Sequence, residues 1–129
     1  MDLLLVSPRE GLWQSMLADF GLRGLGLDWV PTLEQGLVKL RQNPPVALIL
    51  DAATSDEPGA KEAHIKKIRN DLVEILKIDA RVHPVLLSDL PPDELHDALE
   101  GFGLLLCLSA DPASSELERL SEALQEQGV

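Results

Sequence analysis

Five short apolar runs alternate with segments that place apolar residues at helical spacing, and this alternation constrains the fold more than any other feature of the sequence. The apolar runs lie at 3–6, 25–29, 46–50, 85–87 and 104–108. The run at 46–50 follows Pro44 and Pro45, and it is typical of a strand that a parallel sheet buries on both faces. Strict alternation predicts a doubly wound α/β fold: five βα units, a five-stranded parallel sheet and right-handed crossovers that put a layer of helices on each face.

Turn and capping residues separate these elements. Thr32 begins a capping box and predicts the start of a helix. Gly21 is expected to end the first helix, and Asp111 with Pro112 is expected to form the N-cap and first turn of the last one. No linker or shift in composition divides the chain, so we expect residues 1–129 to form one domain.

Charge and cysteine content argue against several classes of function. The formal net charge is −11, and because nucleic acids and anionic membranes are themselves polyanions, we expect the chain to bind neither. Cys107 is the single cysteine, so there is no internal disulfide and no cysteine-based metal cluster, which fits a reducing cytoplasm. The sequence has no signal-peptide pattern and no apolar run of membrane-spanning length. These features together predict a cytoplasmic location.

Asp51 directly follows the run at 46–50, so a parallel sheet would place its carboxylate at the edge where open α/β folds hold their binding groups. The carboxylate could accept a phosphoryl group, or it could accept backbone N–H bonds from the following loop. Asp51, Asp89 and Asp111 could also converge as a magnesium or calcium site, since carboxylates are the ligands that these ions prefer. The alternative for Asp89 and Asp111 is that each caps a helix, because each precedes a proline closely.

Five βα units with an aspartate after the third strand resemble the receiver domain of two-component response regulators. The stretch "NPPVALILD" is similar to the family's approach to its phosphoacceptor, which puts Asp51 in that position. Ser88, at the end of "HPVLLS", is similar to the Ser or Thr that contacts the phosphoryl group in the family, and Gly59 is similar to the glycine that starts the third helix. The resemblance implies a flavodoxin-like three-layer sandwich with strand order 2-1-3-4-5, and a signalling protein that is not an enzyme.

The positions that support phosphoryl chemistry in this family are replaced. Ser7 and Pro8 stand where the family has an acidic pair that binds a divalent metal, and neither is a good ligand for a hard cation. Ala110 and Asp111 follow the fifth strand, where the family has Lys-Pro, so the charge there has the opposite sign. Phosphoryl transfer needs cations to neutralise the transferred group. We therefore expect a degenerate receiver without a cofactor, in which Asp51 is not phosphorylated.

Three functions are consistent with these observations. The first is a degenerate receiver that acts through protein–protein interaction with a histidine kinase, another regulator or an output domain, or as a homodimer through the face of the fourth helix, fifth strand and fifth helix, at about 93–125. The second is a receiver that does accept phosphate at Asp51 and binds magnesium. The third is a small flavodoxin-like enzyme or nucleotide-binding protein, for which Arg9 and the N-terminus of the first helix are the candidate groups. The chain is either a stand-alone regulator or one domain of a longer one.

Overall fold

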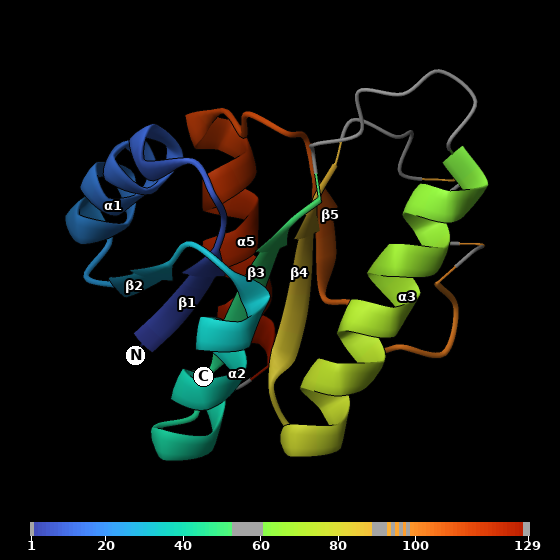
Figure 1. Cartoon of the computed structure of the whole chain (residues 1–129). Helices are drawn as coiled ribbons and strands as arrows, with labels where there is room; N and C mark the ends of the chain where they lie inside the picture. The colour runs from blue at the N-terminus through green and yellow to red at the C-terminus, as the bar shows by residue number, and fades with distance from the viewer. Residues whose placement is uncertain are drawn as a thin grey trace.

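A computed structural model describes residues 2–52, 61–88, 93, 95, 97 and 99–127, and it contains one sheet of five parallel strands in the order β2-β1-β3-β4-β5 (Figure 1). The strands are β1 (Asp2–Val6), β2 (Gly26–Val30), β3 (Ala47–Asp51), β4 (His83–Leu87) and β5 (Leu106–Leu108). The helices are α1 (Glu10–Leu22), α2 (Leu33–Gln42), α3 (Lys61–Ile78) and α5 (Ser114–Glu126). The predicted fold class and strand order are confirmed.

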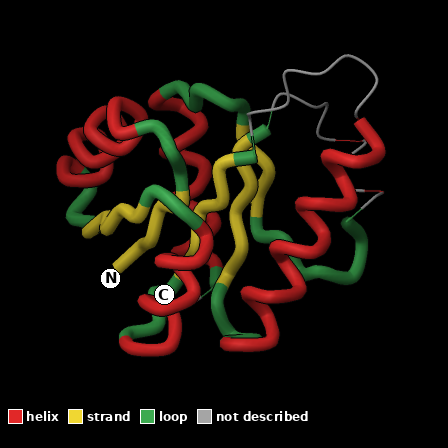
Figure 2. The backbone as a smooth tube through the Cα atoms, viewed as in Figure 1, coloured by secondary structure: helices red, strands yellow, loops and turns green. Residues whose placement is uncertain are grey.

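Helices cover both faces of the sheet, with α1 and α5 on one face and α2 and α3 on the other (Figures 1 and 2). Successive strand residues point to opposite faces, so Leu3 and Leu5 of β1 join the core under α1 and α5, whereas Leu4 and Val6 join the core under α2 and α3. All of β3 is buried because both of its faces are covered. No helix in the described part of the chain is long and apolar enough to cross a membrane.

The first two helices show one corrected boundary and one confirmed cap. Helix α1 continues past Gly21 to Leu22, so the predicted stop at Gly21 is wrong. Gly24 follows the helix with a φ of 74°, a left-handed conformation that favours glycine and ends helices. Thr32 caps α2, as predicted, because its hydroxyl accepts a hydrogen bond from the backbone N–H of Gln35 at 3.3 Å.

The C-terminal part of the chain departs from prediction in two places. Strand β5 is shorter than the predicted run at 104–108 and begins only at Leu106. The N-cap of α5 is Ala113, which makes no side-chain capping bond, so the predicted cap at Asp111 is wrong. The carboxylate of Asp111 is instead bound by an arginine, and such charge-assisted bonds are stronger than an ordinary cap. Asp89 and Gly59 lie outside the described residues, and so does most of the predicted fourth helix.

Asp19 links α1 to α5. Its carboxylate accepts hydrogen bonds from the Ser114 hydroxyl at 2.7 Å and from Nε of Arg23 at 2.9 Å. These two bonds, that of Ser114 first, lower the pKa of Asp19 below its ordinary value of 3.8. Because the folded-state pKa lies below the unfolded value, Asp19 stabilises the fold above that unfolded value and loses this effect as the pH falls through the folded pKa.

We therefore expect Asp19→Asn to lower the urea midpoint of unfolding at neutral pH, and we expect the difference from wild type to shrink steadily below about pH 4. Urea titrations followed by circular dichroism over this pH range measure the effect. Glu122→Gln is a matched control, because exposed Glu122 on α5 makes no hydrogen bond or ion pair with the described residues. A midpoint difference for Asp19→Asn that persists undiminished at acid pH would contradict the assignment.

Candidate functional site

Asp51 ends β3 at the carboxyl-terminal edge of the sheet. Ser7 follows β1 and Ser88 follows β4, which are the two strands that flank β3. Ser7 and Ser88 are buried, and the Asp51 side chain has no exposed surface. The backbone N–H of Ser88 donates to the carbonyl of Leu108 at 3.0 Å. The structure thus places Ser7, Asp51 and Ser88 at the ends of adjacent strands, where the sequence predicted them.

Two donors converge on one oxygen of Asp51. The Ser7 hydroxyl donates to Oδ2 at 2.6 Å, and Nε of Arg9 donates to the same atom at 2.8 Å. The backbone N–H of Arg9 in turn donates to the Ser7 hydroxyl at 3.0 Å, which fixes the orientation of that hydroxyl. A buried carboxylate is costly unless it is paired and hydrogen-bonded. Arg9 supplies the compensating charge, so the ion pair is a condition for burying Asp51.

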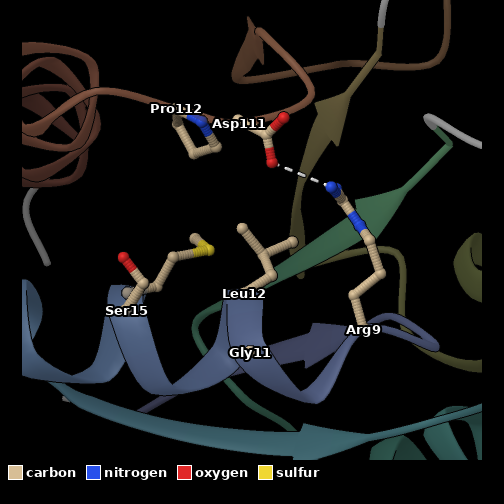
Figure 3. Close-up of a pocket in the computed structure, with 7 residues that line it drawn as sticks. Arg9, Gly11, Leu12, Ser15, Asp111 and Pro112 are labelled. Carbon is tan, nitrogen blue, oxygen red and sulfur yellow. Dashed lines mark hydrogen bonds and ion pairs between the residues drawn. The ribbon is translucent and has the colours of Figure 1, made fainter.

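The same guanidinium reaches the loop between β5 and α5. Its Nη1 donates to Oδ1 of Asp111 at 2.9 Å (Figure 3), and its Nη2 donates to the carbonyl oxygen of Ala110 at 2.7 Å. Arg9 therefore ties together the β1–α1 loop, the end of β3 and the β5–α5 loop. The hydrogen bond to Asp51, helped by the charges of both carboxylates and opposed by burial, raises the pKa of Arg9 above its ordinary value.

The two carboxylates that bind Arg9 differ in environment. The Asp51 side chain is 0% exposed, whereas that of Asp111 is 84% exposed. A buried, hydrogen-bonded pair is costly to break, because one charge is left without compensation. An exposed pair contributes little, because water and salt screen it. The Arg9–Asp51 contact is therefore the costly part of this network to break, and the Arg9–Asp111 contact is the weak part.

Two tryptophans support the β1–α1 loop. The indole N–H of Trp29 donates to the carbonyl oxygen of Ser7 at 2.8 Å. Trp13 of α1 stacks on Trp29 with ring centroids 5.4 Å apart, and its own indole N–H donates to the carbonyl of Leu27 at 3.1 Å. Because the Trp29 bond holds the backbone of Ser7, it also holds the hydroxyl that contacts Asp51, and Trp13 supports Trp29 by stacking.

The β5–α5 loop is held from its other side by Glu116. The backbone N–H of Ser109 donates to Glu116 Oε2 at 3.0 Å, and the Ser109 hydroxyl donates to both carboxylate oxygens at 2.9 and 3.0 Å. Ala110, the next residue, is 8% exposed. Pro8, on the opposite loop, is exposed. Ala110 contributes a carbonyl oxygen to the network around Arg9, and Pro8 has no part in that network.

Sequence reasoning missed the role of Arg9, which it had considered only as a group of a nucleotide site. A usable signal is present. The receiver pattern has acids after the first strand and a lysine after the fifth, whereas this chain has Arg9 after β1 and Asp111 after β5. Each loop carries a charge of the opposite sign, although Arg9 follows the acidic-pair positions Ser7 and Pro8 and does not replace them. Considered together, the two charges predict an attraction between the loops that neither charge predicts alone.

The structure describes two of the three aspartates that the sequence suggested as a metal site. Asp51 and Asp111 both contact Arg9, and Asp89 lies outside the described residues. Within the ranges that the structure describes, no group of three or more His, Cys, Asp or Glu side chains could hold a metal ion. In the described residues, the guanidinium of Arg9 lies between the carboxylates of Asp51 and Asp111.

Several solved structures share this fold, although no family model and no curated protein matches the sequence. A response regulator from Thermotoga maritima has a TM-score of 0.78 at 13% identity, over 96% of this chain and 97% of that one. A CheY-like receiver domain protein from Methanospirillum hungatei has a TM-score of 0.74 at 16% identity, over 98% and 95%. A beryllofluoride-activated NtrC4 receiver domain dimer gives 0.74 at 16%, over 97% of each chain. The structural neighbours are mostly response-regulator receiver domains, and this chain shares their fold.

Proposed function

We propose that this chain, which has the fold of response-regulator receiver domains, is a signalling domain that acts through protein contacts and not through phosphorylation of Asp51. The observation that carries the proposal is the 2.8 Å ion pair between Arg9 and the buried carboxylate of Asp51. A carboxylate that accepts a phosphoryl group must present an oxygen to the donor. Oδ2 of Asp51 already accepts bonds from Ser7 and Arg9, and the side chain has no exposed surface.

Magnesium, which the fold family implies, fits these residues poorly. Mg²⁺ requires hard oxygen ligands in near-octahedral geometry. Where receivers have an acidic pair, this chain has the Ser7 hydroxyl, which donates to Asp51, and the exposed side chain of Pro8. The guanidinium of Arg9 also lies 2.8 Å from Asp51 and would repel a second cation. We therefore propose that Arg9 permanently takes the charge-balancing role of the metal, and we assign no cofactor.

The proposed partners are proteins. Most of the similar structures are response regulators or their receiver domains, which supports two-component signalling with a histidine kinase, another regulator or an output domain. The NtrC4 receiver domain is a dimer, which supports a homodimer of this chain, and we propose the face at about 93–125 for it. Exposed Glu118, Arg119 and Glu122 on α5 provide charged groups for such a contact. An enzyme or nucleotide-binding protein has less support, because Arg9, its candidate group, holds the buried carboxylate of Asp51.

We expect the protein to gain no phosphoryl group when it is incubated with acetyl phosphate and magnesium. Intact-mass spectrometry measures the result, with Asp51→Asn as the matched variant and a receiver that retains its acidic pair and lysine as the positive control. Amide NMR with beryllofluoride and magnesium provides a second readout, in which Asp51, Ser88 and the loop after β5 should not shift. A mass gain in the wild type that Asp51→Asn abolishes would contradict the proposal and identify a working phosphoacceptor.

A further inference from the structure

A pocket of about 380 Å³ lies between the start of α1 and the β5–α5 loop (Figure 3). Leu12 and Met16 of α1 line it, together with Asp111 and Pro112 of the loop. The volume is within the range of small-molecule sites in proteins, which are mostly apolar with a few polar groups that orient the ligand. Leu12 and Ser15 point from α1 towards Asp111 and Pro112, so the helix and the loop form facing walls.

The polar group of this pocket is the guanidinium of Arg9. It carries five N–H donors, and its bonds to Asp51, Ala110 and Asp111 use only one donor at each nitrogen. The bond to Asp111 is the weak one, since that carboxylate is 84% exposed. A ligand carboxylate could therefore replace Asp111 on Nη1 at little cost, while the buried bond to Asp51 stays in place.

We propose that this pocket binds a small aliphatic carboxylate. The ligand's carboxylate takes the place of Asp111 on Nη1 of Arg9, and its alkyl chain packs against Leu12, Met16 and Pro112. A monoanion is favoured over phosphate, because it substitutes for Asp111 with one charge and because the chain has a net charge of −11. Binding leaves the Arg9–Asp51 pair intact, so this inference and the proposed lack of phosphorylation at Asp51 succeed or fail separately.

Gly11 offers a way to block the pocket without unfolding the protein. It lines the pocket on α1, and a Cβ at this position would meet no atom within 4 Å. Gly21 lies near the other end of the same helix and is equally open. Leucine raises helix propensity at either position, so Gly11→Leu and Gly21→Leu should both fold, and only Gly11→Leu should fill the pocket.

The test is a titration of ¹⁵N-labelled protein with sodium hexanoate, followed by amide NMR. We expect saturable shifts at Gly11, Ser15 and Asp111 in the wild type and in Gly21→Leu, and no saturable shifts in Gly11→Leu. We also expect Asp111→Asn to bind hexanoate about three- to tenfold more tightly, because the internal competitor for Arg9 is gone. Tighter binding by Asp111→Asn distinguishes displacement of Asp111 from Arg9 from non-specific adsorption of hexanoate.

Hexan-1-ol and inorganic phosphate test whether binding needs both the carboxylate and the alkyl chain of hexanoate. The alcohol should bind much more weakly than hexanoate, and phosphate should not reproduce the hexanoate shifts. The proposal is overturned if hexanoate causes no saturable shift, if Gly11→Leu binds like wild type, or if the alcohol or phosphate binds as well as hexanoate. Weaker binding by Asp111→Asn would overturn it too, since Asp111 would then help to hold the ligand.

Discussion

Replacing Arg9 with methionine is expected to lower the free energy of unfolding by about 2–4 kcal/mol, because the buried carboxylate of Asp51 would lose its compensating charge. Methionine keeps much of the apolar length of the side chain, so the change reports mainly on charge and hydrogen bonding. The Arg9 side chain is 32% exposed, and solvent screening places the expected cost towards the lower end of this range. Urea denaturation at neutral pH measures the loss.

A double-mutant cycle with Asp51→Asn tests the cause. Asparagine removes the buried charge, so Arg9→Met should cost much less in that background, with a coupling energy of about 1–3 kcal/mol. Arg23→Met is the matched control, because Arg23, the C-cap residue of α1, makes a 2.9 Å ion pair with Asp19 four residues earlier, and such local pairs contribute about 0.5 kcal/mol. Equal losses for Arg9→Met in both backgrounds would show that Asp51 is not what makes Arg9 important.

Replacing Gly36 with leucine is expected to cost about 3 kcal/mol of stability, at the upper end of the usual range for overpacking a core. A Cβ at Gly36 would lie 2.8 Å from Cγ2 of Val6 and 3.5 Å from Cγ2 of Val30. Both valines are stiff, β-branched side chains at the ends of adjacent strands, so they cannot rotate away easily. Helix α2 would have to move off the sheet next to the loop that carries Ser7 and Arg9.

Gly21→Leu is the matched control for this substitution. Gly21 is also helical, but a Cβ there meets no atom within 4 Å. The change should stabilise the protein by about 0.5 kcal/mol, because leucine is the better helix former. Opposite signs for the two variants in urea denaturation would confirm that contact with the sheet, and not helix propensity, determines the result at Gly36. A stabilising Gly36→Leu would show that α2 is not packed as closely as described.

The exchange of charges around Asp51 explains how a receiver fold keeps a buried carboxylate without an acidic pair or a lysine. In this chain the positive charge comes from Arg9, on the loop where receivers place acids, and its outer partner is Asp111, on the loop where receivers place a lysine. Each loop thus carries a charge opposite to the receiver pattern, and the two charges pair with each other. The arrangement is thus a self-contained ion-pair network, and its outer contact is the one open to exchange.

Two sequence expectations about helix ends failed: one because a distant partner competed with a local signal, and one because a nearby glycine took the left-handed position. Asp111-Pro112 has the composition of a helix start, yet α5 begins two residues after Pro112 because Arg9 binds the Asp111 carboxylate. Gly21 has the composition of a helix stop, yet α1 runs through it and Gly24 takes the left-handed conformation. Thr32 met no such competitor and caps α2 as predicted.

The sequence by itself determined the alternation of strands and helices, the fold class and the sheet edge at which Ser7, Asp51 and Ser88 lie. These properties depend on apolar periodicity, prolines and caps, which act between residues close together in the chain. Only the tertiary structure decided what Asp51 binds. Arg9 lies 42 residues from Asp51 and 102 from Asp111, and contacts at these separations depend on strand order and on the conformation of one long side chain. No local pattern encodes them, so the ion pair that best explains this site emerges only when the strands are assembled.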